Sequence, residues 1–318
     1  MARPRRLPYK DRMFRLAHFS DLHLGPLPDV TYRDLVSKRI TGYVNWQRRR
    51  RKTMQEDVID RVVEDMLEAT PDHIALTGDL VNLALDKEID AARIWLETLG
   101  TPHDVSVVPG NHDAYVPGAL DKACKAWGAY MTGDDGHTPK DRSGFPYLRQ
   151  RGPIALVGIS SARATGPFMA NGYFREKQAK KVGRLLDEAR ERGLYRVVMI
   201  HHPPVRGATR TSKRLFGITL FQKTMRKHGA ELVLHGHTHL PSLHTIKGAD
   251  GDIPVVGVAA AGQSLGHSKP AAQYNLLEIE GEPGDWRTTL TRRGVAGLDA
   301  AIGVISREEL HRKQPEAA

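Results

Sequence analysis

Short apolar runs that end in glycine or polar residues recur through most of the chain. They contain β-branched and aliphatic residues, a pattern typical of buried strands, and occupy residues 14–19, 73–77, 105–108, 195–200 and 231–234. Segments with helical periodicity lie between the runs, at residues 57–69, 89–99, 178–192 and 220–228. This alternation predicts a layered α/β core.

Four more apolar segments follow residue 239, and we expect them to complete a second sheet: 243–246, 253–258, 274–280 and 286–292. The predicted fold is a four-layer α/β/β/α sandwich in which two mixed sheets pack face to face between helices. The chain divides into a basic tail at 1–11, one domain at 12–302 and a polar tail at 303–318. We expect one domain because the candidate site residues are spread along most of it and must converge.

Five short polar motifs occur in a fixed order, several of them directly after an apolar run. They are Asp21-Leu-His23, Gly78-Asp79, Gly110-Asn111-His112-Asp113, His201-His202-Pro203 and Gly236-His237-Thr238-His239. Loops at the carboxyl ends of strands are where ligands collect in an open α/β sheet. Oxygen and imidazole donors without thiolates suit divalent Mn, Fe, Zn or Co. Two such ions, about 3.5–4 Å apart, need a bridging ligand, and we assign that role to Asp79 at a sharp Gly-Asp turn.

Together the motifs resemble those of the calcineurin-like metallophosphoesterase superfamily, and within it the compact bacterial phosphodiesterase branch. The resemblance covers residues 21–239 and makes the domain at 12–302 a catalytic one. It implies that one metal ion is held by Asp21, His23, Asp79 and His239. It implies that the other is held by Asp79, Asn111, His201 and His237. His112 is implied to contact the substrate.

One position departs from a common pattern of the superfamily. Many relatives carry an aspartate three residues after the bridging aspartate, where this chain has Asn82. An amide can accept a hydrogen bond from His112 but cannot stabilise an imidazolium by its charge, so the metals are expected to carry more of the barrier. We expect His202, His235 and Asp113 to orient ligands rather than to bind metal.

Composition and charge add limits on location and partners. The formal net charge is +10 and the sequence pI is near 9.7, so the field attracts anions without distinguishing nucleotides, nucleic acid and anionic lipids. Cys124 is the only cysteine, which excludes an intramolecular disulfide and favours a reducing compartment. The amino terminus is unlike a signal peptide, and no apolar stretch reaches the ~20 residues that a membrane helix needs. We expect a cytoplasmic protein, peripheral at the inner membrane face if it contacts lipid.

Two insertions distinguish the chain from a bare catalytic core. Residues 30–53 include the basic run Arg48–Lys52 among aromatic and aliphatic residues, which suits an anionic membrane surface, nucleic-acid phosphates or a solvated helix face. Residues 114–152 directly follow a site motif, and we expect their aromatics to cover the substrate as a mobile cap. Packing on the core is the alternative for these aromatics: Trp127, Tyr130, Phe145 and Tyr147.

The expected reaction is hydrolysis of a phosphate ester, in which a metal-bound hydroxide attacks phosphorus in line. The preferred substrate is a small phosphodiester, cyclic nucleotides included. The first alternative is a nucleotide-linked acyl sugar of lipid A synthesis, cleaved at its pyrophosphate. A nuclease ranks third, and nucleic acid is less expected because the chain has no coiled-coil arm or separate DNA-binding domain. The non-enzymatic alternative is an RNA- or membrane-binding adaptor with a vestigial metal site.

Overall fold

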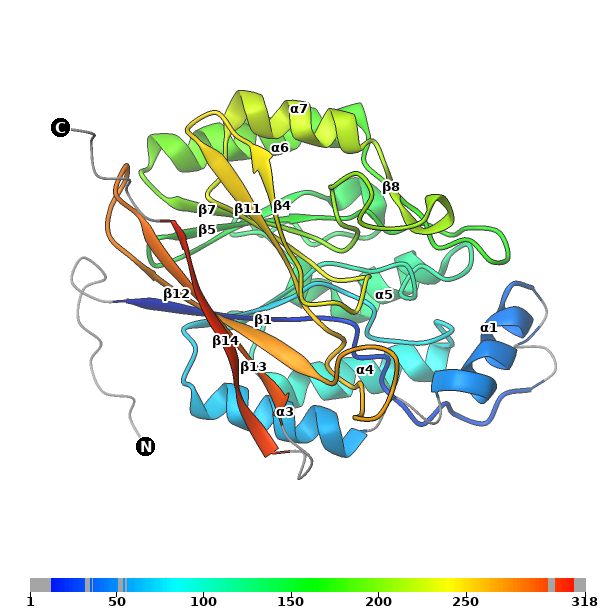
Figure 1. Ribbon diagram of the computed structural model, residues 1–318. Coiled ribbons are helices and arrows are strands. Elements are labelled where there is room, and N and C mark those ends of the chain that lie inside the picture. The colour runs from blue at the N-terminus through cyan, green and yellow to red at the C-terminus, as the bar shows by residue number, and fades with distance from the viewer. Residues whose placement is uncertain are drawn as a thin grey trace.

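The computed structural model describes residues 13–31, 35, 37–50, 54, 56–296 and 301–311, with the backbone alone at residues 49, 50, 56 and 311. The predicted tail at 1–11 lies outside the described residues, as do Arg51 and Lys52 of the basic run. Two six-stranded mixed sheets face each other, and helices cover their outer faces (Figure 1). The predicted four-layer sandwich is therefore confirmed. No helix within the described ranges has both the length and the hydrophobicity needed to cross a bilayer.

The first sheet has the order β14-β13-β12-β1-β2-β3. Its parallel half consists of β1 (Phe14–Phe19), β2 (His73–Leu76) and β3 (Val105–Val107). Its antiparallel half consists of β12 (Gln273–Glu280), β13 (Arg287–Ala296) and β14 (Ala301–His311). Two helices cover its outer face in Figure 1, α3 (Glu56–Glu68) and α4 (Asp86–Leu99).

The second sheet has the order β10-β11-β9-β7-β5-β4. Its strands are β4 (Tyr147–Arg151), β5 (Ile154–Ile159), β7 (Tyr195–Ile200), β9 (Leu232–His235), β10 (Leu243–Lys247) and β11 (Asp252–Gly257). The helices α6 (Glu176–Glu191) and α7 (Ile218–His228) cover it. A small parallel pair, β6 (Gly172–Tyr173) and β8 (Leu215–Phe216), lies beside it.

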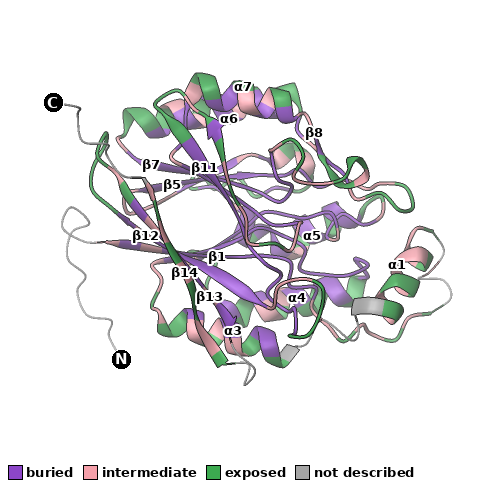
Figure 2. Cartoon of the chain, in the orientation of Figure 1, coloured by how far each residue is buried: buried purple, intermediate pink, exposed green. Residues whose placement is uncertain are grey.

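The core lies between the two sheets and beneath the helices, where buried residues predominate (Figure 2). The strands β5 and β7 are buried at every position, as central parallel strands are expected to be. The buried faces hold the sheets in a fixed relation, so the carboxyl ends of β1, β2, β3, β7 and β9 meet at one edge.

Two predictions about the organisation are corrected. The segments after residue 239 do not all join the second sheet, because β12 pairs antiparallel with β1 and so carries β13 and β14 into the first sheet. The predicted polar tail at 303–318 is a strand up to residue 311. This strand lies at the sheet edge with many exposed positions, so its sequence is charged although Ile302 and Leu310 pack on the core.

Both insertions contain helices that periodicity did not reveal. The first includes α1 (Arg39–Asn45) and a short π-helix at Trp46–Arg50, and the second includes α5 (Ala119–Trp127). Figure 1 shows α1 at the right-hand end of the molecule, outside the layers of the sandwich. A helix of seven residues with no buried side chain gives little periodic signal, which is why the pattern of apolar positions missed it.

Candidate metal centre

The five sequence motifs converge where the strands β1, β2, β3, β7 and β9 end. Potential ligand atoms in each of three groups lie within 4.8 Å of one another. The groups are Asp21/His23/His239, His23/Asp79/His112 and Asp79/His201/His237. Asn111 joins the third group because its Oδ1 lies 3.3 Å from Nε2 of His201. The structure thus brings together all seven candidate ligands, with Asp79 between the two halves.

The spacing of these atoms fits coordination of a metal ion. In the first half, Nε2 of His239 lies 3.1 Å from Oδ1 of Asp21 and 3.4 Å from Nε2 of His23. In the second half, Nε2 of His201 lies 3.4 Å from Oδ2 of Asp79. Two donors bound to one ion at 2.0–2.1 Å in tetrahedral geometry lie about 3.3–3.4 Å apart. Among the described residues, no hydrogen bond of regular geometry reaches the buried Oδ1 of Asp21, as expected of an atom that faces a cation.

Backbone strain is concentrated in the same residues. Nine described non-glycine residues have positive φ, and five of them are candidate ligands. These five are Asp21 (57°), His23 (48°), Asp79 (57°), His237 (67°) and His239 (56°). Each left-handed residue costs of order 1 kcal/mol, and such strain persists where it serves function. The conformation turns successive side chains of a motif toward one point.

Two glycines allow the loops after β2 and β3 to touch. Gly78 has φ +95°, and a Cβ there would lie 2.4 Å from the backbone nitrogen of Gly110 if it kept its position. A Cβ at Gly110 would collide with the carboxylate and the backbone nitrogen of Asp79. This close approach explains the glycine before Asp79 and the glycine before Asn111.

Asp113 holds these two loops together, as predicted for a residue that orients ligands. Its carboxylate accepts hydrogen bonds from four backbone amides, those of Gly110 (2.8 Å), Asp79 (2.9 Å), Leu80 (2.9 Å) and Val81 (3.3 Å). Burial and the charge of Asp79 raise the pKa of Asp113 to about 7, against the lowering effect of the amides. The carboxylate thus fixes the backbone on which Asp79 and Asn111 stand.

Three imidazoles are oriented by main-chain carbonyls. Nδ1 of His201 lies 2.6 Å from the carbonyl oxygen of Thr77, and Nδ1 of His23 lies 3.2 Å from that of Val81. A proton on Nδ1 leaves Nε2 unprotonated toward the centre, which is the tautomer that binds metal. His237 differs, since its Nε2 lies 2.8 Å from the carbonyl oxygen of Lys213.

The expected contact between His112 and the amide of Asn82 is corrected. Nδ1 of His112 lies 2.5 Å from the main-chain carbonyl of Asn82, while Nδ2 of Asn82 donates to the carbonyls of His23 (3.2 Å) and Leu24 (2.9 Å). Asn82 therefore orients His112 through its backbone and holds the His23 loop through its side chain. The comparison of Asn82 with the aspartate of many relatives concerns the side chain alone. It could not predict a contact to His112 that the backbone carbonyl makes.

The electrostatics favour cations in this centre. Burial would raise the pKa of Asp79, but the charge of His201 holds it well below its usual range. Burial likewise opposes ionisation of Asp21, whose pKa His239 lowers. Burial, followed by the charge of His201, lowers the pKa of His202 to about 3. The carboxylates stay ionised, and His202 stays neutral.

His202 and His235 lie outside the three groups. Nδ1 of His202 lies 2.8 Å from Oγ of Ser161, and its Nε2 lies 3.1 Å from the carbonyl oxygen of Ala170. Nε2 of His235 lies 3.4 Å from Oγ of Ser242. Their rings support the loops that carry His201 and His237, and the structure brings His201 rather than His202 to the centre.

A cavity of about 660 Å³ opens beside the centre. Its lining includes candidate site residues, among them Asp79, Asn111 and His112. The lining also includes basic residues that the motifs did not reveal: Arg48, Lys213, His267 and Lys269. Arg48 comes from the first insertion, Lys213 ends a short 3₁₀ helix at Thr211–Lys213, and the other two come from an irregular loop, so no spacing rule marks them as functional. The cavity therefore combines a candidate cation-binding centre with basic residues that suit an anion.

Known proteins with the same arrangement identify the chain's family. Over residues 14–241 the chain matches the calcineurin-like phosphoesterase family. It belongs to that family. It is 25% identical over 241 residues to a probable cyclic nucleotide phosphodiesterase of Synechococcus sp., covering 72% of this chain and 80% of that protein. The superfamily predicted from the motifs is confirmed, and the protein is a hydrolase of phosphoric esters.

Solved structures show the same fold. A dimetal phosphatase from Danio rerio superimposes with a TM-score of 0.60 at 13% identity, over 94% of this chain and 99% of that one. A purple acid phosphatase from yellow lupin seeds superimposes with a TM-score of 0.55 at 12% identity, over 95% of this chain and 54% of that one. At such identities the likeness concerns the fold alone.

The second insertion of this phosphoesterase is not a substrate cap. Trp127, Tyr130, Phe145 and Tyr147 are all buried in the main core. Their polar atoms also bond inward, as when the indole of Trp127 donates to the carbonyl of Ile89 at 2.9 Å. The expectation failed because proximity to a motif in sequence does not place an aromatic ring on the surface.

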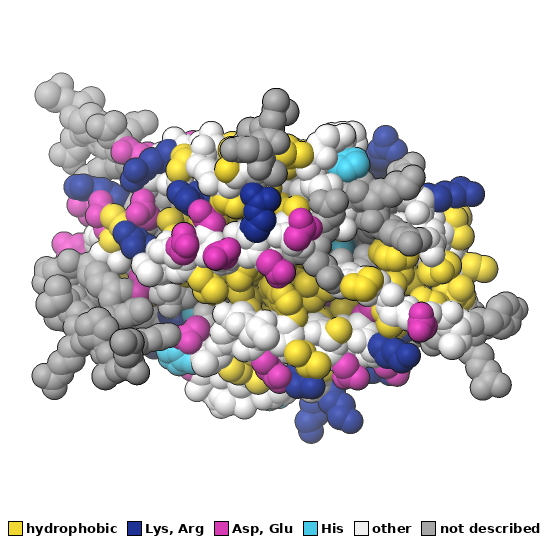
Figure 3. Space-filling model, turned by 90° about the horizontal axis from the view of Figure 1, so that it is seen from below, with side chains coloured by type: hydrophobic (Ala, Val, Ile, Leu, Met, Phe, Trp, Pro, Cys, Tyr) yellow, Lys and Arg dark blue, Asp and Glu magenta, His cyan; other side chains and the backbone are white. Residues whose placement is uncertain are grey.

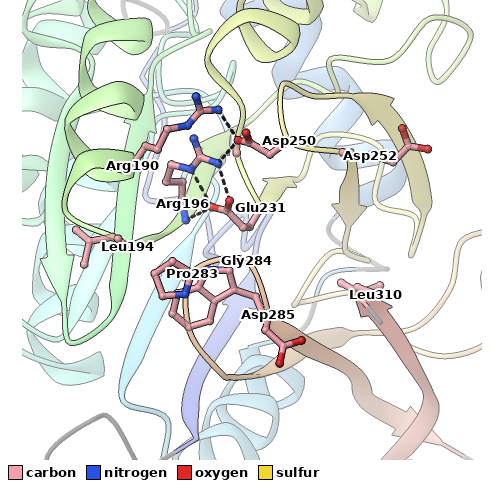
Figure 4. A pocket seen from close by; sticks show the side chains of 14 residues that line it. Arg190, Leu194, Arg196, Glu231, Asp250, Asp252, Pro283, Gly284, Asp285 and Leu310 are labelled. Atoms are coloured by element: carbon pink, nitrogen blue, oxygen red, sulfur yellow. Dashed lines mark hydrogen bonds and ion pairs between the residues drawn. The ribbon is translucent and has the colours of Figure 1, made fainter. Parts of the chain in front are cut away.

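The phosphoesterase has a larger cavity, of about 960 Å³, built around the amino-terminal ends of β7 and β9, away from the metal centre (Figure 4). Arg196 donates to Glu231 at 2.6 Å and to Asp250 at 2.9 Å, and Arg190 also bonds Asp250. These charges satisfy one another. Size alone therefore does not mark the reactive site.

Proposed function

We propose that this phosphoesterase hydrolyses a phosphodiester at two divalent metal ions. The observation that carries the proposal is the pair of ligand groups that meet at Asp79 and open, beside His112, into a cavity with basic walls. Similarity to a probable cyclic nucleotide phosphodiesterase supports a diester, cyclic nucleotides included, as the substrate. Mn, Fe, Zn and Co all suit the nitrogen and oxygen donors.

The candidate site residues would have separate roles in the reaction. Asp21, His23, Asp79 and His239 would hold one ion, and Asp79, Asn111, His201 and His237 would hold the other. When bound, the ions supply a water nucleophile at neutral pH and offset charge on the phosphoryl oxygens. His112, whose Nδ1 would donate to the carbonyl of residue 82, would donate a second hydrogen bond from Nε2 to the phosphoryl group when its imidazole is protonated on both nitrogens.

A nucleotide-linked acyl sugar, cleaved at its pyrophosphate, is the second candidate substrate. It is favoured by the basic residues Arg48, Lys213 and Lys269, which line the cavity together with the candidate ligands. A second phosphate would find counter-charges there. A cyclic nucleotide has only one phosphate, so it would leave part of this basic wall unused.

The test replaces Asp79 by Asn. Losing the shared charge should collapse both metal content and turnover of bis(p-nitrophenyl) phosphate, with the fold intact by circular dichroism. Asp90→Asn, on the exposed side of α4, is the matched control and should retain both. Two metal ions per chain and wild-type turnover in Asp79→Asn would refute the bridging role. A panel of cyclic nucleotides, diesters and nucleotide-linked lipids, run with each metal, then separates the two substrates.

A further inference from the structure

Exposed apolar side chains gather around the opening of the active-site cavity. Eleven large hydrophobic residues are exposed among the side chains that the structure describes. Six of them form what we call the apolar rim: Ile40, Val44, Phe168, Met169, Leu240 and Leu265. Phe168 is the extreme case, with 86% of its surface exposed and φ at 62°. Figure 3 shows hydrophobic side chains at the end of the molecule where α1 lies.

Members of the apolar rim adjoin residues that line the cavity. Val44 precedes Asn45, Met169 precedes Ala170, and Leu240 follows His239. Leu265 lies between Gln263 and His267, which also line it. Three loops and α1 therefore present apolar groups at the opening rather than at unrelated places on the surface.

The position of α1 at this opening is fixed by contacts. The guanidinium of Arg39 donates to the carbonyls of Leu83 (3.0 Å) and Ala84 (2.6 Å). Nζ of Lys38 donates to Oγ1 of Thr165 (2.7 Å) and to the carbonyl of Met169 (2.8 Å). The helix is thus bound both to the site and to the loop that carries Phe168.

The packed side of α1 determines which of its residues face outward. A Cβ at Gly42 would collide with Tyr115 and Leu83, so this side of the helix is in close contact with the domain. Ile40 and Val44 lie about 160° around the helix from residue 42. They are 53% and 42% exposed and share one outward face.

Basic side chains accompany the apolar rim. Arg48 and Lys213 are exposed and line the cavity, as does Lys269. Apolar residues interspersed with cations are the composition of surfaces that insert into the headgroup region of anionic bilayers. The net charge of +10 adds long-range attraction to such a surface.

From this arrangement we propose that the apolar rim docks the enzyme on an anionic phospholipid bilayer and delivers a lipid-linked phosphate ester to the cavity. The proposal rests on the phosphoesterase function above, since it assigns the class of substrate to the same site. The apolar rim enters the acyl boundary, the basic side chains contact lipid phosphates, and the cavity opens toward the membrane.

Vesicle sedimentation tests the docking. The full-length wild type should bind phosphatidylglycerol vesicles and bind phosphatidylcholine vesicles far more weakly. Phe168→Ser and Ile40→Gln should each lower the partition coefficient about tenfold, because each removes a buried apolar contact with the lipid. Ile94→Gln is the matched control, since Ile94 on α4 has the same exposure of 53% as Ile40. Turnover of bis(p-nitrophenyl) phosphate should stay at the wild-type level in all three.

The outcomes separate this proposal from the proposed function. No binding by the wild type, or equal binding by Phe168→Ser, Ile40→Gln and wild type, overturns docking even when the soluble diester is hydrolysed. An apolar rim that served a protein partner would give the same negative result. Vesicle binding that depends on Phe168 and Ile40, without hydrolysis of any phosphate ester, would instead support docking and refute the proposed function.

Discussion

Replacing Asp113 by Asn should destabilise the domain strongly while changing its volume little. The two carboxylate oxygens accept four backbone N–H groups, two on each oxygen. An asparagine has one oxygen, so two amides would lose their acceptor and face the donor Nδ2. Each buried donor left without an acceptor costs about 1–3 kcal/mol, so the free energy of unfolding should fall by about 2–6 kcal/mol.

Urea denaturation of the chelated protein measures this loss without a contribution from bound metal. The comparison belongs at a pH of about 5, below the raised pKa of about 7 of Asp113, because above that pKa the folded protein carries the cost of a buried ionised carboxylate, which asparagine would relieve. The exposed Asp90→Asn should change stability by less than about 0.5 kcal/mol. A loss at Asp113→Asn below about 1 kcal/mol would show that the four amides find other partners and that Asp113 does not hold the ligand loops.

Two further substitutions test contacts that the sequence did not reveal. Asn82→Asp would place a carboxylate against two main-chain carbonyls, so it should cost about 1–3 kcal/mol in urea denaturation and should not strengthen His112 as an acid. A stable variant whose pH–rate profile moves to higher pH would contradict this. Gly42→Ala should displace α1 by its collision with Tyr115 and speed tryptic cleavage there about tenfold, whereas Gly166→Ala, with open space around its Cβ, should not. Equal cleavage of the two variants would show that α1 is not packed as described.

The candidate metal centre was the most predictable part of the molecule because metal binding requires particular residue types, and a sequence shows these directly. The donor atoms must belong to Asp, Asn or His side chains. These residues must follow strands that end at one edge of a sheet. Asp21, Asp79 and His201 satisfy both conditions, so five short motifs were enough to predict which side chains converge. The four-layer fold followed from the same apolar runs, since buried parallel strands are nearly continuous in hydrophobic residues.

The remainder depended on contacts that no spacing rule encodes. The role of Asn82 rests on its backbone carbonyl, an atom that every residue has, so its side-chain identity pointed to the wrong contact. Trp127 and Tyr147 are buried by packing against residues far away in the sequence. An aromatic residue that follows a motif can lie in the core or over the site, and the sequence does not distinguish the two. The strand β14 carries charge because an edge strand has an exposed face, and a charged terminal segment has the composition of a tail.

The backbone conformation that places the candidate ligands is one that destabilises the fold. Five ligand positions with left-handed backbone cost about 5 kcal/mol together, which is comparable with the net stability of many domains. Asp and His are tolerable there, since short polar side chains visit this region more readily than branched ones. The compensating contacts come from residues outside the ligand set, above all from the four bonds of Asp113. Loss of Asp113 should therefore weaken metal binding through the backbone, whereas loss of Asp79 would remove a proposed ligand directly.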